Sequence, residues 1–341
     1  MSDFRVNTIT NRDGSYGPQV CGITTFGSSG LQLPSGSTEM RGGRSRGIFD
    51  SGATPSATNV IDFIEITTQG DAQDFGDDLF AREEGHAAFA SATRGCMGGG
   101  QTPTVLSSIT YITMSSGGGA KDFCDLATAV TRNVGLSDSV RGISGGGYVA
   151  PVQVATLEFV TIASTGDGTN YGDLTQARAG SGACASHTRG LFAGGYDGTA
   201  PNYNIIDFIT IATLGEAQDF GDLTDDPNHG VGCSNSTRGL FAGGQNPSNI
   251  NTIVYVTIAT EGNAIDFGDL AQGGNNGKID YLGACASETR GIFGGGQTPT
   301  KINTIQFVNI ASTGNTKDFG DLTVARRFTM GFSNVHGGLA Q

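Results

Sequence analysis

The sequence predicts an all-β protein made of a series of small antiparallel sheets. The first reason is an Arg-Gly pair, followed by apolar residues and glycines, that recurs at intervals of 47 to 52 residues. A repeat of that length is typical of stacked supersecondary units. The second reason is a content of 56 glycines without a triplet period, which suits many tight turns. The third is that no segment of a copy requires a helix. The arginines of the six pairs are Arg46, Arg94, Arg141, Arg189, Arg238 and Arg290.

The copy at residues 175–223 shows four expected strands separated by turn-forming residues. The first strand, 182–186, has only small side chains, and the second, 191–193, ends at a pair of glycines that can adopt positive φ. The third strand, 205–212, is rich in isoleucine, phenylalanine and threonine, which favour pleated sheets. The fourth is 218–223. Each copy is therefore predicted to form a four-stranded antiparallel sheet.

The third strand of this copy is too apolar for a sheet with one face in water. Sheets that pack face to face around an axis cover both faces, and the strands nearest the axis are then the most crowded. A small-residue stretch recurs where such crowding is expected. Together these features predict a β-propeller. The equivalent stretches of other copies are 87–92, 232–236, 283–287 and 330–333.

The C-terminus determines the expected number of blades. The first copy lacks its own innermost strand because residues 39–45 are polar and rich in glycine and arginine, whereas 327–333 provide a spare strand. Completing the first sheet with the last strand removes exposed edges. We therefore predict a propeller of six four-stranded blades over residues 46–341. A seventh blade from 327–340 and Val6–Ile9 is the alternative.

This order of strands resembles the kelch repeat over residues 46–341. The family's fold is a propeller whose first strand is innermost. The kelch pattern has a tryptophan in the outer strand, and this chain has no Trp. An aromatic ring takes that place in each copy, as Phe75, Phe123, Tyr171, Phe220, Phe267 and Phe319.

Residues 12–43 resemble the lead-in of structural and tail-fibre-like proteins of marine cyanobacterial phages, above all at Leu33–Glu39. The phrases TRGLFAGG and AQDFGDL also resemble the kelch-like arrays of those proteins. The resemblance implies a virion component, such as a tail-fibre, baseplate or capsid-associated protein. It implies that an extended segment, 1–45, attaches to other virion proteins, and it suggests a trimer.

Composition limits the partners. A net charge of −13 without a basic cluster disfavours nucleic acid. No apolar signal region opens the chain, and no apolar segment is long enough to span a bilayer. We therefore expect that the protein does not insert into membranes and that it is assembled in the host cytoplasm. The 15% of charged residues is low for a fully solvated surface, which suggests that other subunits cover part of it.

No cofactor or metal is expected. Cys184, Cys233 and Cys285 occupy equivalent inner-strand positions, where a free thiol acts as a small buried hydrophobe. Neither a disulfide pattern nor zinc-ligand spacing is present. The four histidines fall at different offsets and lack a nucleophile in a known motif, which argues against an enzyme.

Recurring charges are expected to be structural, with each arginine donating to carboxylates or turn carbonyls that hold strands or neighbouring blades together. A catalytic centre needs a unique constellation, and these residues are copies. Besides the arginines of the repeat, Arg94, Arg141, Arg189, Arg238 and Arg290, the set includes Asp122, Asp219, Asp266 and Asp318.

The loops after the double glycines differ between copies and should all emerge on one face, where recognition residues usually lie. A purely turn-forming role for their Pro and Asn residues is the alternative. The sequence predicts a non-enzymatic interaction protein. A receptor-binding lectin for host glycans is the alternative. The second alternative is a polysaccharide-active enzyme, which would need an asymmetric set of acids or metal ligands at the axis. The candidate binding residues are Gln101, Thr102, Tyr148, Tyr196, Asp197, Gln245, Asn246, Gln297 and Thr298.

Overall fold

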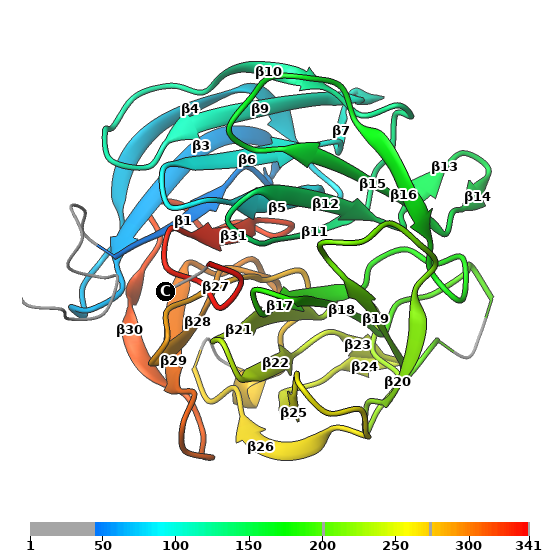
Figure 1. Ribbon diagram of the computed structural model, residues 1–341. Coiled ribbons are helices and arrows are strands. Elements are labelled where there is room, and N and C mark those ends of the chain that lie inside the picture. Colours follow the sequence, from blue (N-terminus) through cyan, green and yellow to red (C-terminus); the bar gives the residue numbers. More distant parts are fainter. Residues whose placement is uncertain (1–44, 200–201, 273–274, 340–341) are drawn as a thin grey trace, which may run out of the picture. The chain divides into compact units, whose positions relative to one another are not determined.

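Six four-stranded antiparallel sheets surround a central axis in the computed structural model, which describes residues 45–199, 202–272 and 275–339 (Figure 1). All of these residues belong to the unit Gly43–Ala340. The innermost strands neighbour one another in a closed cycle. The all-β class and the six-bladed β-propeller predicted from the sequence are confirmed. The predicted attachment segment 1–45 lies, except for Ser45, outside the described residues.

The four strands of each blade follow one another from the axis outward. Blade 1 consists of β31 (Met330–Ser333), β1 (Arg46–Asp50), β3 (Ser56–Glu65) and β4 (Gln73–Arg82). Blade 2 consists of β5 (Ala87–Ala90), β6 (Arg94–Gly98), β9 (Ser108–Thr113) and β10 (Lys121–Asp125). Blade 3 consists of β11 (Val134–Ser137), β12 (Arg141–Gly145), β15 (Thr156–Thr161) and β16 (Thr169–Asp173).

Blade 4 consists of β17 (Gly182–Ala185), β18 (Arg189–Ala193), β19 (Ile205–Thr210) and β20 (Gln218–Asp222). Blade 5 consists of β21 (Val231–Ser234), β22 (Arg238–Ala242), β25 (Thr252–Thr257) and β26 (Ile265–Asp269). Blade 6 consists of β27 (Gly283–Ala286), β28 (Arg290–Gly294), β29 (Thr304–Asn309) and β30 (Lys317–Asp321). Short additional elements are β2 (Ala53–Thr54), β7 (Gln101–Thr102), β8 (Thr104–Val105), β13 (Tyr148–Val149), β14 (Val152–Gln153), β23 (Gln245–Asn246), β24 (Ser248–Asn249) and η2 (Asn275–Gly277).

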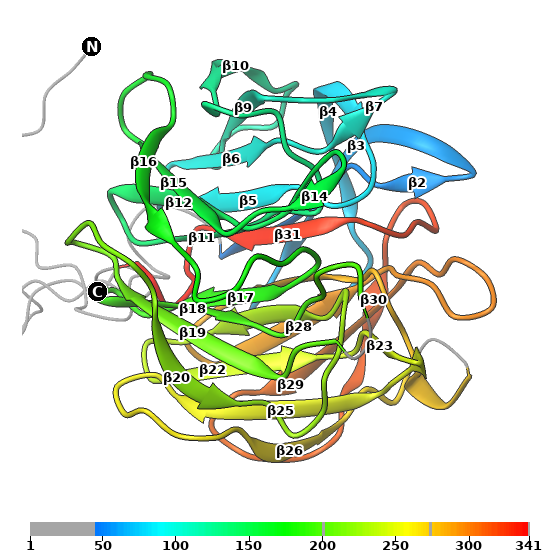
Figure 2. The same cartoon turned by 90° about the vertical axis from the view of Figure 1, so that its right-hand side faces the viewer.

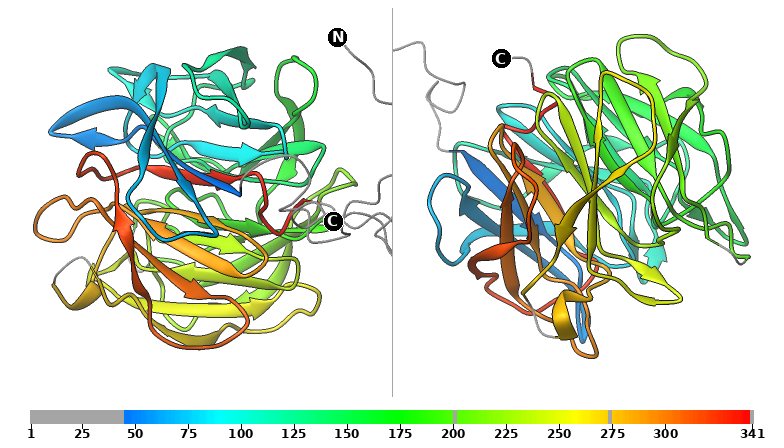
Figure 3. Two further views of the ribbon diagram at one scale, coloured as in Figure 1. Left: turned by 90° about the vertical axis from the view of Figure 1, so that its left-hand side faces the viewer. Right: turned by 90° about the horizontal axis from the view of Figure 1, so that it is seen from below.

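The C-terminal strand closes the ring. β31 pairs antiparallel with β1, so that Gly47 faces Ser333 and Asp50 faces Met330. Figure 3 shows this last strand, in red, beside the first, in blue. The predicted closure is confirmed, and because 330–333 complete blade 1, the described residues form no seventh blade.

The inner strands alternate between two types. β5, β17 and β27 carry alanine at the second and fourth positions, whereas β11, β21 and β31 carry glycine and serine there. A Cβ atom added at Gly232 would lie 2.5 Å from the carbonyl oxygen of Ala183 in the preceding blade, so only glycine allows this approach. The Oγ of Ser234 then donates to the Ala185 carbonyl at 2.7 Å. The ring is therefore built from three pairs of blades.

The Arg-Gly phrase joins neighbouring blades. The guanidinium of Arg238 donates to the Ile310 carbonyl of the next blade at 3.0 Å and lies 4.8 Å from the ring centre of Tyr255 in its own blade. The glycine of the phrase leaves room for an inner-strand side chain of the preceding blade, since a Cβ at Gly239 would lie 2.7 Å from Sγ of Cys184. The expected buried free thiols are confirmed at Cys184, Cys233 and Cys285.

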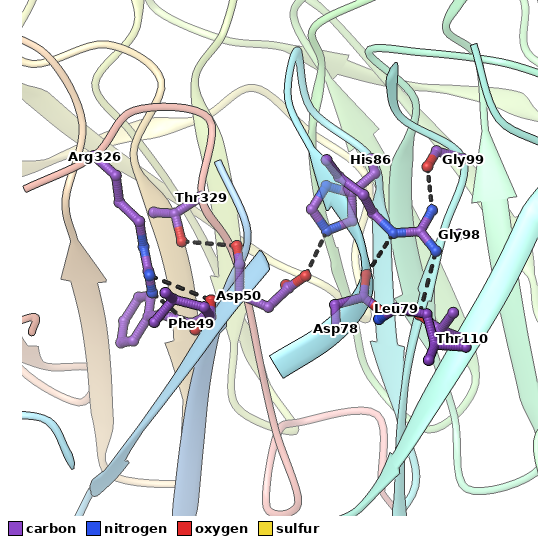
Figure 4. Close-up of polar contacts among 12 residues, drawn as sticks. Phe49, Asp50, Asp78, Leu79, His86, Gly98, Gly99, Thr110, Arg326 and Thr329 are labelled. Carbon is purple, nitrogen blue, oxygen red and sulfur yellow. Dashed lines mark hydrogen bonds and ion pairs between the residues drawn. The ribbon is translucent and has the colours of Figure 1, made fainter. Parts of the chain in front are cut away.

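Buried ion pairs connect the segments that lead into the inner strands with the strands of the blades. Arg82 contacts Asp78 at 2.7 Å and Arg326 contacts Asp62 at 3.1 Å, with all four side chains fully buried. Figure 4 shows the neighbouring contact in which His86 meets Asp50 at 2.9 Å. Such groups must be paired to be tolerated in a core. They therefore belong to the scaffold that fixes the segments leading into the inner strands.

Candidate functional site: a pocket at one mouth of the axial channel

The loops after the double glycines lie on the face from which the chain enters the inner strands. In each of five blades, the first loop residue forms a β-bridge with a residue in the short segment that leads into the inner strand of the same blade. Figure 2 shows the resulting hairpins, β2, β14 and β23 among them, on one side of the propeller. We call this side the loop face. The bridges are Glu83–Gln101, Thr131–Tyr148, Ala179–Tyr196, Asn228–Gln245 and Asp280–Gln297.

A ring of six left-handed residues surrounds the axis on the loop face. Their φ angles lie between 55° and 75°, although four of the six are not glycine. Five successive N–H groups each donate to the carbonyl of the preceding ring residue, over 2.7–3.4 Å. Blade neighbours are thus joined at the mouth of the channel, and six side-chain positions are brought together there. We call these residues the mouth ring: Gly85, Arg132, Gly180, His229, Tyr281 and Phe328.

The mouth ring is chemically asymmetric. On one side, Arg132 donates through Nε and Nη2 to Oε2 of Glu84, at 3.2 and 2.9 Å, and through Nη1 to the hydroxyl of Tyr196. The Arg132 and Glu84 side chains are 29% and 32% exposed, so the pair borders the solvent of the channel mouth. Oε1 of Glu84 has no hydrogen-bond partner among the described residues.

The opposite side of the mouth ring is aromatic. The ring centres of His229 and Tyr281 are 4.4 Å apart, and those of Tyr281 and Phe328 are 4.2 Å apart. Both contacts are tilted, which suits the quadrupoles of the rings. Behind them, the guanidinium of Arg327 lies 5.0 Å from the Phe328 ring centre and donates to Gln297 at 3.0 Å. We call His229, Tyr281 and Phe328 the aromatic wall.

Burial and neighbouring charges shift two pKa values at this mouth. Burial, aided by the positive charge of Arg132, lowers the pKa of His229 from 6.5 to about 3, so its imidazole is neutral at pH 7. Burial also raises the pKa of Asp280 to about 6, against the opposing effects of Asn249 and Arg327. Neither ring nitrogen of His229 hydrogen-bonds to a described residue. The imidazole can therefore donate or accept at the pocket.

These groups line an open cavity, and the space among its lining atoms is about 610 Å³ when the solvent at its opening is included. Its walls are the mouth ring and Glu84, and its floor is formed by the small inner-strand residues Ala88, Ala183 and Ala284. We call it the mouth pocket. Its lining combines apolar walls with a few placed polar groups, as is typical of ligand sites.

The structure brings some of the predicted loop residues to the mouth pocket and leaves others away from it. Tyr196 bonds to Arg132, Tyr148 lies 5.8 Å from the Arg132 guanidinium, and Gln297 bonds to Arg327. The remaining predicted residues serve turns or neighbouring loops. Asp197 accepts from Thr199 and Tyr203, Asn246 donates to Asp226, Gln101 donates to Pro103, and Thr298 bonds to Thr300; the backbones of Thr102 and Gln245 pair in hairpins.

The residues that form the mouth ring were not predicted from the sequence. They stand two positions before the inner strands and show neither a motif nor a constant residue type. The sequence does contain a signal for this site, because a position whose residue type differs between the copies of a regular repeat can indicate a ligand-binding position. This signal identifies the site only when the structure shows that the position lies on the loop face and next to the axis.

The recurring charges occupy other places. Every repeat arginine donates to a main-chain carbonyl of the next blade: Arg46 to Met114, Arg94 to Ile162, Arg141 to Ile211, Arg189 to Ile258, Arg238 to Ile310 and Arg290 to Ile66. Asp122, Asp219, Asp266 and Asp318 are exposed on the outer strands, and none is ion-paired with these arginines among the described residues. Those residues also contain no cluster of three or more His, Cys, Asp or Glu side chains that could hold a metal.

The opposite mouth of the channel is covered by the residues that follow β31. Nε2 of His336 donates to the Ala90 carbonyl at 2.9 Å, and the N–H of Gly337 donates to the Ser234 carbonyl at 3.0 Å. The segment thus bridges inner strands of different blades. Among the described residues, this segment narrows the access to the channel from the side opposite the loop face.

Comparisons with known proteins add no family. No protein-family model matches the chain, and no curated protein matches it either. Within the described residues, no helix is both long enough and apolar enough to cross a lipid bilayer.

Proposed function

We propose that this chain is a non-enzymatic interaction protein of a bacteriophage particle. In this proposal, residues 1–45 attach it to other virion proteins, and the propeller presents its loop face to a partner outside the particle. The chain would be assembled into virions in the host cytoplasm, as a trimer if it follows the proteins it resembles. The assignment to a phage is supported by the resemblance of residues 12–43 and of the repeat phrases to cyanophage structural proteins.

The observation that carries the interaction role is the asymmetric mouth of an otherwise repetitive scaffold. The blades keep the same arginines, glycines and aromatic pairs wherever they contact one another. At the mouth ring the six equivalent positions instead carry Gly, Arg, Gly, His, Tyr and Phe. Contacts between blades do not require this diversity, so a ligand is the simplest reason for it.

Binding explains these groups better than catalysis does. Arg132 and Glu84 neutralise each other, and a histidine whose pKa lies near 3 is a weak proton acceptor at neutral pH. The aromatic wall favours one second candidate, the receptor-binding lectin for host glycans, because stacked rings are a common platform for sugars. Both candidates place the contact on the loop face.

The location is tested in purified particles of the phage that encodes the chain. Mass spectrometry and antibody labelling should find the protein in intact virions. Replacing Leu33–Glu39 with a Gly-Ser segment in the full chain should abolish incorporation. A matched double variant on an exposed loop, P299A with T300A, should be incorporated normally. Particles that are infectious and lack the protein would refute the proposal.

A further inference from the structure

We propose that the mouth pocket is a saccharide-binding site that holds one neutral pyranose ring between the aromatic wall and the Glu84–Arg132 pair. The inference rests on the proposed interaction function and names the ligand class of its loop face. It assigns recognition to a set of residues that are far apart in the sequence and meet only at the axis.

The pocket is divided into an apolar and a polar side, as a sugar ring requires. A pyranose has C–H bonds on its faces and hydroxyl groups around its edge. The C–H bonds carry partial positive charge, which the negative face of an aromatic ring attracts. Phe328 is only 9% exposed, so the accessible part of this wall consists mainly of His229 and Tyr281. A sugar ring that rests on them has its edge within the same cavity as Glu84 and Arg132.

Two of the residues that line the pocket, Glu84 and His229, also have unused hydrogen-bonding atoms. Oε2 of Glu84 already accepts from Arg132, but Oε1 has no partner among the described residues and can accept from a sugar hydroxyl. The neutral imidazole of His229 can donate from one nitrogen and accept at the other. Hydroxyl groups both donate and accept, and therefore match this mixed set better than a ligand that only donates or only accepts.

The charges at the mouth favour a neutral ligand. Two guanidinium groups, Arg132 and Arg327, stand at the mouth with two acidic groups, Glu84 and Asp280. The arginines repel a cation from the aromatic wall. The acidic groups, in a chain of net charge −13, repel an anion. A neutral ligand avoids both penalties.

The shape of the channel limits which part of a glycan can enter. Its inner strands present alanine and glycine residues to the axis, and the segment that contains His336 bridges inner strands at the other mouth. A glycan therefore cannot thread through the propeller. The site fits a ring at the end or branch of a glycan chain, which enters from the loop face.

The experiment uses the full chain and a panel of neutral methyl pyranosides, measured by saturation-transfer NMR and calorimetry. At least one member should bind, with the contact on its ring C–H protons. The uronic acid and the amino sugar of the same stereochemistry should bind more weakly, because each carries a charge.

Variants locate the site. Glu84→Gln keeps the shape of the side chain and should weaken binding about tenfold, because a charge-assisted hydrogen bond is lost. Tyr281→Ala should weaken it by a similar factor of about ten through lost stacking. The matched control is Glu261→Gln, since Glu261 pairs with Arg189 away from the mouth and is 55% exposed. Circular dichroism and thermal melting check that each variant is folded.

Three results would overturn the inference. They are the absence of binding by every neutral pyranoside at millimolar concentration, tighter binding of the charged sugars, and binding that is equal in wild type, E84Q and Y281A. The proposed function fails separately, because it is tested by incorporation into particles. A protein that is present in virions and binds no sugar would retain the first proposal and lose this one.

Discussion

The two mouths of the axial channel differ in how far they keep the symmetry of the repeat. On the covered side, the inner strands end in alternating alanine and serine, and serine hydroxyls bond to alanine carbonyls of the neighbouring blade. On the loop face, the six equivalent residues have an acid–base pair on one side and an aromatic wall on the other. The sequence thus stays regular where blades hold one another and diverges where a ligand can reach.

The largest expected effect is on the side that holds the blades together. Gly232→Ala places a Cβ 2.5 Å from a backbone oxygen that cannot move aside, and should lower the free energy of unfolding by about 2 to 3 kcal/mol. Gly166→Ala is the matched control, because nothing lies within 4 Å of its added Cβ. Urea denaturation measures both. Equal stability of the two variants would contradict the paired arrangement of blades.

The repeat arginines should have the next largest effect. Arg94→Ala removes hydrogen bonds to the carbonyls of Ile162 and Ala163 and the contact with Tyr111, and should destabilise the protein by about 1 to 2 kcal/mol. Asp122→Asn changes an exposed residue of the same repeat and should stay within about 0.5 kcal/mol of wild type. Thermal melts of both variants test this difference. A costly Asp122 substitution would show that the recurring carboxylates do contribute to blade packing.

A substitution in the segment that covers the mouth opposite the loop face should have a smaller effect on stability. His336→Ala removes the hydrogen bond to the Ala90 carbonyl, which also accepts from Ser137, so the expected loss of stability is about 1 kcal/mol. Binding at the loop face should be unchanged. Calorimetry with the best pyranoside from the panel checks the second point. A change in affinity would mean that the two mouths are coupled through the channel.

The smallest expected effect is a pH dependence on the loop face. The pKa of His229 is lowered from 6.5 to about 3, so the unfolded chain binds the additional proton between these pH values. Wild type therefore loses stability from this group as the pH falls from about 6.5 to about 3. His229→Gln lacks this penalty. Its stability relative to wild type should rise on going from about pH 7 to about pH 4.5 in urea melts.

Two residues serve as references for that measurement. Asp280, whose pKa is raised to about 6, contributes the opposite slope, but it is present in both proteins and cancels in their difference. His187→Gln is the matched loss of an exposed imidazole. A wild-type-minus-variant difference that does not change with pH would show that His229 is not held in the buried, uncharged state.

Much of the fold could be predicted because each copy of the repeat contains the residues that its own strands and turns require. The small residues of 182–186 and the double glycine at Gly194-Gly195 predicted an inner strand and the turn after its neighbour, and both are found there. The candidate site was predicted in part. The loop residues Tyr148, Tyr196 and Gln297 lie beside the pocket, whereas its walls come from Arg132, His229, Tyr281 and Phe328, which belong to no motif.

By itself, the sequence determined the all-β class, the six blades and their closure by the last strand. Small residues, glycines and aromatic rings recur at a fixed spacing because each blade packs closely against its neighbour. Only the tertiary structure decided which residues meet at the axis. Ring closure places positions nearly fifty residues apart beside one another and turns their side chains toward one cavity. A contact of that kind depends on the geometry of all six blades together, and no single repeat carries it.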